Sequence, residues 1–452
     1  MFNDTITAIS TALGEGAISI VRLSGSQAIE IVDKVFKEKN LHNVKSHTIH
    51  YGHIIDPEDN TLVDEVLVTV MRSPNTYTTE DIVEVNCHGG IFVTNKILEI
   101  VLTLGARLAE PGEFTKRAFL NNRIDLAQAE SVMDLINAKT EASLKVAVNA
   151  LDGRVSNLIS DLREVVLGIV ASIEVNIDYP EYDDAVVMTN EILKPQIQNV
   201  ITKMDEILEV AKTGKIIREG IKTVIVGKPN VGKSSLLNKL MREEKAIVTE
   251  VAGTTRDLVE GYINIGGIIL NLIDTAGVRE TKDIVEAIGV ERTKKVVNEA
   301  ELILLVLNNN EQLNKDDEKL LELTKDKKRI IIINKMDLDS NINKAKLPNY
   351  LETSMLNDDS ILMIEKEIKQ LFELGEIKSQ DLTYMSNSRH IAKLKSARKS
   401  LGDALDSISN KMPIDMIEID VKEAWINLGE ILGEEVGDNL INELFSKFCL
   451  GK

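Results

Sequence analysis

The sequence predicts an α/β plus α protein, in which two α/β regions are joined and followed by amphipathic helices. Three observations predict this class. Short apolar runs occur near the N-terminus and again between residues 221 and 333, where helical patterns separate most of them. Between and after these regions, apolar residues recur every three or four positions. The length of 452 residues allows roughly two to four domains.

Composition is that of an ordinary globular protein of the cell interior. Hydrophobic residues make up 43% and aromatic residues only 4%, so aliphatic side chains must dominate the core. The longest uncharged run, residues 261–273, is shorter than the ~20 apolar residues of a membrane-spanning helix. No secretory signal is evident, and two cysteines are too few for a disulfide framework. We therefore expect a cytoplasmic protein with no membrane segment.

The net charge of −19 bears on the partners of the chain. Such acidity argues against broad, nonspecific binding to nucleic acid, whose phosphates attract cations. It leaves open a local basic site for one structured RNA.

The first 118 residues have the pattern of a mixed α/β domain. Residues 17–23, 66–71 and 82–85 are short apolar runs that predict strands. Gly89 and Gly90 separate the last run from a helical pattern over residues 91–104. We expect the first domain over residues 1–118.

A long apolar stripe of helical period follows. Aliphatic residues between Leu144 and Ile169 are spaced by three or four positions, which predicts one face of a single long helix. Pro180 and the acidic stretch after it interrupt the pattern. A second helix is predicted from about Glu191 to Ala211, with Gly214 just beyond its end.

Helical patterning returns after about residue 374 and continues to Phe448. It favours one helical domain, residues 119–216 and 377–452, interrupted by an inserted α/β domain over residues 217–376. Two independent helical units are the alternative.

The inserted block carries a phosphate-binding motif. Residues 227–234, GKPNVGKS, fit G-x-x-x-x-G-K-[ST] and lie between a predicted strand, residues 221–226, and a predicted helix. The glycines let backbone N–H groups converge on phosphate oxygens at a helix N-terminus. Lys233 would then reach the β- and γ-phosphates, and Ser234 would bind Mg²⁺.

Two further motifs follow predicted strands of the same block. Asp274-Thr-Ala-Gly277 comes after the run 268–273, where Asp274 suits a direct or water-mediated Mg²⁺ role and the Gly277 N–H could sense the γ-phosphate. Asn334-Lys335-Met-Asp337 comes after the run 330–333. The Asp337 carboxylate can accept two hydrogen bonds from guanine, a pair that adenine does not offer. The three motifs in this order predict a Ras-like P-loop GTPase domain, and residues 352–355 are assigned as a further base-proximal element.

The predicted site lacks the glutamine that orients the attacking water in many small GTPases. Val278 occupies that position and cannot hydrogen-bond through its side chain. Glu280, Asp283 and Glu286 are candidates to position the water, and solvated loop acids are the alternative.

The group that supplies positive charge in the transition state is also open. Arg256, Arg279 or a monovalent cation could take the place of an arginine finger. The segment 253–257, GTTRD, is the place for a switch threonine that binds Mg²⁺, and chemistry alone does not distinguish Thr254 from Thr255.

Other motifs lie beyond those common to G proteins. They are SIVRLSG and CHGG near the N-terminus, PGEFTKRAF and RIDLAQAE in the middle, and the terminal Cys449-Leu-Gly-Lys452. Together with GKPNVGKSS, GTTRD and DTAGVRE in the inserted block, they make the chain resemble the MnmE (TrmE) family of tRNA modification GTPases along its whole length.

The resemblance implies an N-terminal domain that binds tetrahydrofolate and forms a homodimer, and an inserted G domain that pairs across this dimer in the transition state. It implies K⁺ in place of an arginine finger, held by the Asn230 side chain and the backbone carbonyls of Thr249, Val251 and Thr254. Ser234 and Thr255 would bind Mg²⁺, and Glu286 matches the water-orienting glutamate of the family. The residues expected to contact GTP are Asn230, Val231, Gly232, Lys233, Ser234, Ser235, Thr249, Glu250, Val251, Ala252, Gly253, Thr254, Thr255, Asp274, Thr275, Ala276, Gly277, Asn334, Lys335 and Asp337.

The family's site for 5-formyl- or 5,10-methylene-tetrahydrofolate would map to Arg22, Glu84 and Arg123, with Lys452 nearby. An arginine suits the folate carboxylates or the pterin carbonyl, and Glu84 can accept from the pterin amino and ring N–H groups. An ordinary strand-end salt bridge is the alternative for Arg22 and Glu84. Cys449 is either a catalytic thiol delivered by the tail or a small apolar residue at a helix end.

The implied function is a K⁺-dependent GTPase in tRNA modification. Its partner would be an FAD-dependent protein of the MnmG (GidA) type, in a heterotetramer or larger complex. Together they would add an aminomethyl or carboxymethylaminomethyl group to C5 of the wobble uridine of certain tRNAs, with folate as the one-carbon donor. The alternatives are a ribosome-assembly GTPase of the Era or EngA type and a nucleotide-switched interaction protein.

Overall fold

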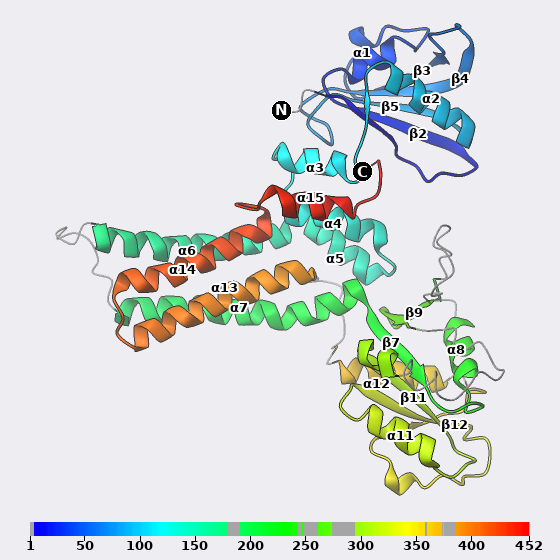
Figure 1. The fold of residues 1–452 in the computed structure, drawn as a ribbon, viewed down its shortest axis with the longest axis vertical. Helices are drawn as coiled ribbons and strands as arrows, with labels where there is room; N and C mark the ends of the chain where they lie inside the picture. Colours follow the sequence, from blue (N-terminus) through cyan, green and yellow to red (C-terminus); the bar gives the residue numbers. More distant parts are fainter. Residues whose placement is uncertain are drawn as a thin grey trace. The chain divides into compact units, whose positions relative to one another are not determined.

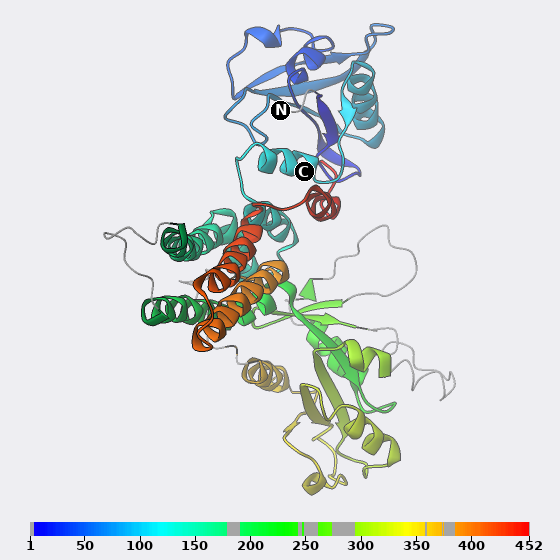
Figure 2. The same ribbon diagram turned by 60° about the vertical axis from the view of Figure 1, so that its left-hand side comes forward.

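The computed structural model describes residues 4–178, 190–242, 246–247, 261–273, 294–357, 359–372, 374 and 385–451 (Figures 1 and 2). The chain divides into two compact units. The first unit is Met1–Met133, Leu151–Lys194 and Lys399–Lys452, and the second is Asp134–Ala150 and Pro195–Arg398. These divisions fall inside helices, and the domain boundaries expected from the sequence stay predictions.

The first unit contains a six-stranded sheet. In spatial order its strands are β3 (Thr48–Ile55), β4 (Leu62–Met71), β5 (Ile82–Gly89), β2 (Gly16–Ser24), β1 (Ile6–Ile9) and β6 (Arg107–Leu108). Neighbouring strands are antiparallel except β1 and β6, which are parallel. The strands predicted over residues 17–23, 66–71 and 82–85 are confirmed, each inside a longer strand.

The two faces of this sheet differ. Val21, Val68 and Val85, on three neighbouring strands, are buried in one core with helices α1 (Ala28–Asp33) and α2 (Ile91–Thr103). Side chains alternate along a strand, so Arg22 and Glu84 point to the opposite face. This opposite face therefore carries Arg22 and Glu84, two of the residues predicted to bind folate.

The remaining helices of the first unit come from distant parts of the sequence. They are α3 (Glu113–Leu120), α4 (Leu126–Asn137), α6 (Arg154–Asp178), α14 (Ile414–Leu432) and α15 (Asp438–Ser446). Helices α6 and α14 lie side by side in both views (Figures 1 and 2), and Lys422 of α14 pairs with Glu174 of α6 at 2.7 Å. The amphipathic segments before and after the inserted block thus share a core, as the split helical reading expects.

The single long helix predicted through residues 144–169 is wrong. Helix α5 (Glu141–Leu151) ends before Gly153, and α6 begins at Arg154. Gly153 has a φ of 84°, the left-handed conformation that commonly ends a helix. The apolar spacing runs unbroken across this turn, and the glycine was the only local signal of the break.

The second unit contains a seven-stranded sheet. In spatial order its strands are β13 (Tyr350–Glu352), β12 (Arg329–Asn334), β11 (Leu302–Asn308), β7 (Ile221–Val226), β10 (Ile268–Leu272), β9 (Gly261–Ile265) and β8 (Ala246–Ile247). The first five strands are parallel to one another, whereas β9 is antiparallel to both of its neighbours, β10 and β8. Helices α8 (Lys233–Arg242), α11 (Lys315–Leu323) and α12 (Asp359–Leu371) accompany them. Every residue of β11 is buried, as expected of a central parallel strand.

The second predicted helix ends later than expected. Helix α7 (Asn190–Glu219) continues through Gly214, and Gly220, with a φ of 74°, ends it instead. The Gly220 N–H donates to the Ile216 carbonyl at 2.9 Å, and the buried Ile217 packs against Val146 of α5. Tertiary packing therefore carries the helix past a residue that disfavours helix.

Helix α13 (Ser388–Ser409) lies beside α7 in both views (Figures 1 and 2), and Arg398 pairs with Asp205 at 2.9 Å. Short 3-10 turns occur at Leu41–Asn43 and Lys344–Lys346. Within the described residues, no helix has the length and apolar character needed to cross a bilayer.

Candidate functional site

The phosphate-binding loop joins the end of β7 to the start of α8. Gly227 and Gly232 have φ values of 155° and 105°, and a Cβ at Gly232 would collide with the side-chain amide of Asn334. Only glycine fits at Gly232. Because α8 begins at Lys233, the loop leads directly into a helix N-terminus, whose partial positive charge favours a phosphate anion.

Lys233 is held across the same loop. Its Nζ donates to the carbonyls of Gly227 at 2.8 Å and Lys228 at 2.6 Å. Burial lowers the pKa of Lys233, because desolvation disfavours the charged ammonium group. A phosphate anion beside this group would counter that penalty. Ser234 and Ser235 follow in the first turn of α8, and Val231 is fully buried beneath the loop.

The base-selecting motif meets the phosphate loop through Asn334. The Asn334 Nδ2 donates to the Val231 carbonyl at 3.0 Å, and its Oδ1 accepts from the Met355 N–H at 3.3 Å. Three segments far apart in the sequence are thus held by one buried amide. Lys335, next in the motif, has a φ of 65°.

Asp337 lies exposed at the rim of an open cavity of about 610 Å³. The Ser354 hydroxyl donates to the Asp337 carboxylate at 2.6 Å. Ser354, Thr353 and Met336 line the same cavity. The segment assigned from the sequence as base-proximal, residues 352–355, therefore lies beside Asp337.

Arg22 and Glu84 are paired across neighbouring strands, close to the end of β2 and the start of β5. They are register partners on β2 and β5, and Arg22 Nε donates to Glu84 Oε1 at 2.8 Å. Their side chains are 21% and 19% exposed, so the pair is largely covered yet reachable from solvent. The two predicted residues are thus joined by a salt bridge near the strand ends, and their role in folate binding stays a prediction.

The C-terminal tail reaches the same pair. The Gly451 carbonyl accepts from Arg22 Nη1 at 3.3 Å and from Ser10 Oγ at 3.1 Å, and the Cys449 carbonyl accepts from the Gly112 N–H at 3.3 Å. Gly451 is buried with a φ of 85°, and a Cβ there would collide with the Ile9 carbonyl. The thiol-bearing Cys449 is exposed. The tail is therefore bound by its backbone.

The two predicted arginines stand over rings of one apolar cluster. Arg123 lies 4.9 Å from the Tyr77 ring centroid, and Arg22 lies 5.7 Å from that of Phe114. Tyr77 and Phe114 pack with the same buried residues of β1. Sequence reasoning missed these two rings and Ser10, because no spacing marks residues that only the folded sheet brings together.

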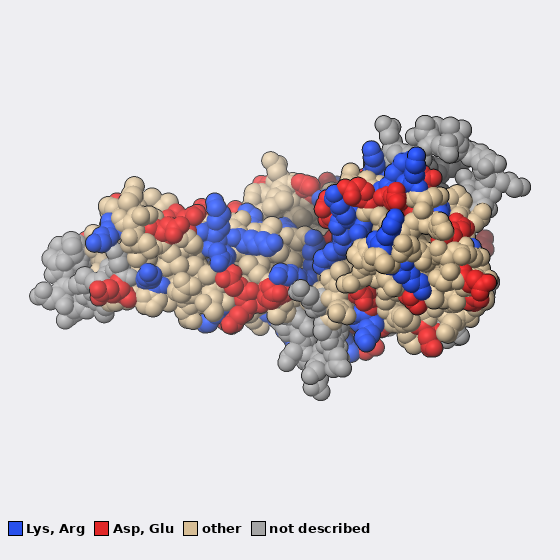
Figure 3. Space-filling model, turned by 90° about the horizontal axis from the view of Figure 1, so that it is seen from below, with Lys and Arg blue, Asp and Glu red and all other residues tan. Residues whose placement is uncertain are grey.

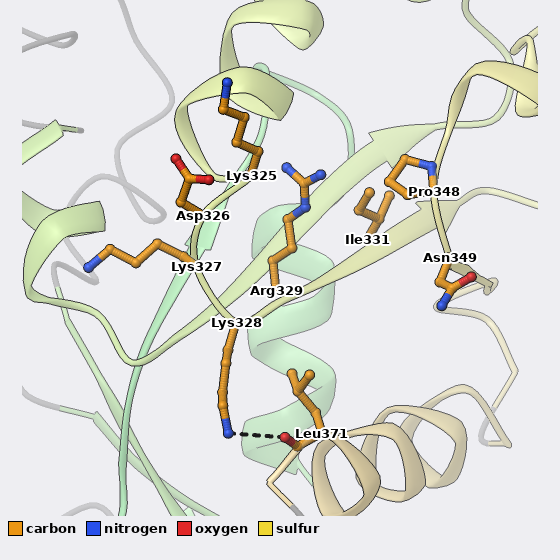
Figure 4. Close-up of a pocket in the computed structure, with 9 residues that line it drawn as sticks. All are labelled: Lys325, Asp326, Lys327, Lys328, Arg329, Ile331, Pro348, Asn349 and Leu371. Carbon is orange, nitrogen blue, oxygen red and sulfur yellow. Dashed lines mark hydrogen bonds between the residues drawn. The ribbon is translucent and has the colours of Figure 1, made fainter.

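A separate pocket of about 590 Å³ at the start of β12 is lined by the basic segment 325–329 (Figure 4). Lys327 Nζ donates to the Asn298 carbonyl, Lys328 Nζ to the Leu371 carbonyl and Arg329 to the Thr324 hydroxyl. In Figure 4 these side chains point apart. Figure 3 shows acidic side chains beside basic ones on the face it displays. The basic residues at this pocket satisfy backbone and hydroxyl groups near helix ends, an arrangement that stabilises the fold.

Several predicted site residues lie outside the described residues, together with the alternatives weighed for the catalytic charge and water. They are Thr249, Glu250, Val251, Ala252, Gly253, Thr254, Thr255, Arg256, Asp274, Thr275, Ala276, Gly277, Arg279, Glu280, Asp283, Glu286 and Lys452.

A phosphate loop after a central parallel strand is hydrogen-bonded to Asn334 of the Asn-Lys-Met-Asp motif, whose Asp337 is exposed at an open cavity, and this combination defines the class of P-loop GTP hydrolases. Comparison with known proteins narrows this class. Residues 5–123 match the family model of the GTP-binding protein TrmE N-terminus, and residues 126–449 match that of the MnmE helical domain. The chain belongs to the MnmE (TrmE) family of tRNA modification GTPases.

Individual relatives agree with the family models. Proteins named tRNA modification GTPase MnmE from two strains of Staphylococcus aureus are each 56% identical over 456 residues, which cover 99% of both chains. Among solved structures, an Era variant of Aquifex aeolicus bound to GDP and AlF4⁻ is 30% identical. That match covers 40% of this chain and 66% of the other, with a TM-score of 0.27.

Proposed function

We propose that this GTPase works in a K⁺-dependent cycle with an MnmG (GidA)-type, FAD-dependent partner to modify the wobble uridine of certain tRNAs at C5. A tetrahydrofolate one-carbon unit would become part of the added aminomethyl or carboxymethylaminomethyl group. The observation that carries this proposal is the tail contact: Gly451 is bonded to Arg22 of the Arg22–Glu84 pair, which delivers Cys449 to the same region.

In the nucleotide site, Lys233 and the first turn of α8 would bind the phosphates, and Asp337 would select guanine. Ser234, with Thr255, would hold Mg²⁺, since hydroxyl oxygens suit this hard cation. Asn230 is exposed in the loop with a φ of 62°, so its amide oxygen is free of the core and fits a K⁺ ligand. Bound K⁺ would supply positive charge at the developing transition state, and Glu286 would orient the water.

In the N-terminal domain, Arg22, Glu84 and Arg123 would bind the folate. A largely covered carboxylate beside an arginine matches the donors and acceptors of a pterin. The rings of Tyr77 and Phe114 add an apolar surface for its flat face. Lys452 would follow Gly451 into this site.

A homodimer through the N-terminal sheet is supported by its open face. Ile18, Ile49, Tyr51 and Leu67 are large apolar side chains that are 45% exposed or more. Tyr51 and Leu67 are register partners on β3 and β4, so they form part of one strip. Exposed apolar strips of this kind are typical of protein interfaces. The dimer, in the cytoplasm, would assemble with the flavoprotein into a heterotetramer or larger complex.

The test is a complementation experiment in a strain that lacks the gene. Bulk tRNA is digested to nucleosides and analysed by mass spectrometry, with wild-type, Asp274→Ala and Cys449→Ser proteins supplied in turn. We expect loss of the C5 aminomethyl-type nucleosides, restored by wild type and by neither variant. An unchanged nucleoside profile in the deletion strain would contradict the proposal.

A second, independent experiment with purified protein tests the dependence on K⁺. GTP hydrolysis is measured in K⁺ and in Na⁺ at equal ionic strength, and faster hydrolysis in K⁺ is expected. Equal rates in the two salts would contradict the proposed K⁺ site.

In the complementation experiment, restoration of the modification by Cys449→Ser would show that the cysteine has only a packing role. The ribosome-assembly alternative loses its support, because both family models that match belong to MnmE.

A further inference from the structure

We propose that Lys228, the second residue of the phosphate loop, is a positioning residue for nucleotide binding, because its side chain ties the loop to the first turn of α11 through Asp317. This role concerns the established GTPase activity and does not depend on the folate or the flavoprotein.

The tie is a buried ion pair. Lys228 Nζ lies 2.7 Å from Asp317 Oδ2 and 3.4 Å from Glu311 Oε2, and the side chains of Lys228 and Asp317 are 12% and 3% exposed. Buried pairs of this kind are little screened by salt and have fixed geometry. The side chain of Lys228 therefore has one well-defined position.

Asp317, the partner of Lys228, is itself held at the start of α11 through its Oδ2 atom and its backbone N–H. Asp317 accepts from the Asn314 N–H, and the Asn314 side chain accepts from the N–H groups of Asp316 and Asp317, which completes a capping box at the start of α11. Glu311 accepts from Asn308, the last residue of β11. The anchor is thus built on a rigid helix end and a central strand.

The backbone carbonyl of Lys228 contacts the phosphate-binding lysine. This carbonyl accepts from Lys233 Nζ at 2.6 Å, so the same residue that is anchored by its side chain also orients the phosphate-binding lysine. A shift of the Lys228 carbonyl would move the Lys233 ammonium group. Loss of one hydrogen bond to a charged group weakens binding by roughly tenfold to a hundredfold.

The experiment must separate positioning from folding. Lys228→Met alone would leave the Asp317 carboxylate buried without its partner, which destabilises the protein. The double variant Lys228→Met with Asp317→Asn removes both charges, and the new amide oxygen can still accept from Asn314. Lys228→Arg keeps the charge, and Lys319→Met removes an exposed lysine of the same helix as a matched control.

Affinity for a fluorescent GDP analogue and the unfolding temperature are measured for each full-length protein. We expect the double variant to recover the unfolding temperature that Lys228→Met loses, yet to bind the analogue about tenfold to a hundredfold more weakly than wild type. Lys228→Arg should bind more tightly than the double variant, and Lys319→Met should match wild type. If affinity in the double variant returns to the wild-type value together with stability, Lys228 is structural only and the proposal is overturned. Unchanged affinity in Lys228→Met would overturn it as well.

Discussion

At the scale of single residues, the two best-defined chemical groups are Lys233 and Asp337. Lys233 is charged but buried against two carbonyls, and Asp337 is exposed at the rim of a cavity. We propose that the first binds a phosphate anion and that the second binds a neutral base that donates hydrogen bonds. Each gives a separate prediction.

Nucleotide binding should take up protons at alkaline pH. Burial lowers the pKa of Lys233 below its ordinary value of 10.5, and bound phosphates would raise that pKa again because they favour the ammonium form. Between these two pKa values, GDP binding converts a neutral amine into a charged one. Calorimetry of GDP binding in two buffers with different ionisation enthalpies should therefore show proton uptake that increases as pH rises toward the lysine range.

The lowered pKa of Lys233 also predicts the direction in which folding stability changes with pH. Between the lowered pKa of Lys233 and its ordinary value of 10.5, the unfolded chain binds more protons than the nucleotide-free fold. This group therefore makes the fold more stable as pH rises through that window.

Lys233→Arg, which stays protonated, is the control for the calorimetry of GDP binding. Binding heats at alkaline pH that are the same in both buffers for wild type would contradict the prediction.

Asp337→Asn should weaken GTP binding and improve binding of xanthosine triphosphate. An amide cannot accept both guanine hydrogen bonds, whereas it can donate to the 2-oxo group of xanthine. Loss of a hydrogen bond to a charged group predicts a GTP affinity lower by roughly tenfold to a hundredfold. Competition binding with both nucleotides measures the switch. Asp359→Asn, at the same cavity, is the matched control and should leave the preference for guanine intact.

At the scale of elements, glycines set where helices end. Gly153 separates α5 from α6, and Gly220 separates α7 from β7, both in the left-handed conformation. The sequence pattern alone favoured a continuous stripe in the first case and Gly214 as the stop in the second. What distinguishes Gly220 from Gly214 is its surroundings: Ile217 is buried against α5, and the Glu219 carbonyl accepts from Asn271 at 2.7 Å.

Gly220→Ala should loosen the junction between α7 and the seven-stranded sheet. The left-handed conformation costs an alanine about 1–2 kcal/mol, and its Cβ would lie 2.7 Å from the Ile269 carbonyl oxygen. Hydrogen exchange of amides in β7 and β10 measures the local opening. Gly168→Ala, inside α6 with open space around the site, should instead stabilise by about 0.5–1 kcal/mol. If the amides of β7 and β10 exchange equally slowly in both variants, the junction at Gly220 tolerates a side chain.

At the scale of the whole molecule, the chain's C-terminus returns to the domain formed by its N-terminus. Ser10 and Arg22 bind the Gly451 carbonyl, and Gly112 binds that of Cys449. The C-terminal tail is therefore hydrogen-bonded beside the Arg22–Glu84 pair of the N-terminal sheet.

Removal of residues 449–452 should weaken folate binding while GTP hydrolysis continues. The tail completes the surroundings of Arg22, whereas the phosphate loop and Asp337 lie in the other compact unit. Titration of 5-formyl-tetrahydrofolate against the truncated and full-length proteins, with GTPase rates measured in parallel, separates the two effects. Cys449→Ser keeps the backbone contact and should bind folate normally. Unchanged folate affinity after truncation would mean that the tail lies outside that site.

The sequence by itself determined the motifs and the strands that carry them. GKPNVGKS, NKMD and the apolar runs around them are local patterns, because a phosphate loop needs glycines and lysine within eight residues and a buried parallel strand needs a continuous apolar run. The terminal tetrapeptide and the N-terminal motifs likewise indicated the family before any coordinates. Only the tertiary structure decided that Asn334 joins the phosphate loop to residue 355, that Gly451 binds Arg22, and that Lys228 is anchored by Asp317. These contacts link residues that are 21 to 429 positions apart. No periodicity records such pairs, since they depend on how sheets and helix ends pack and not on the order of neighbouring residues.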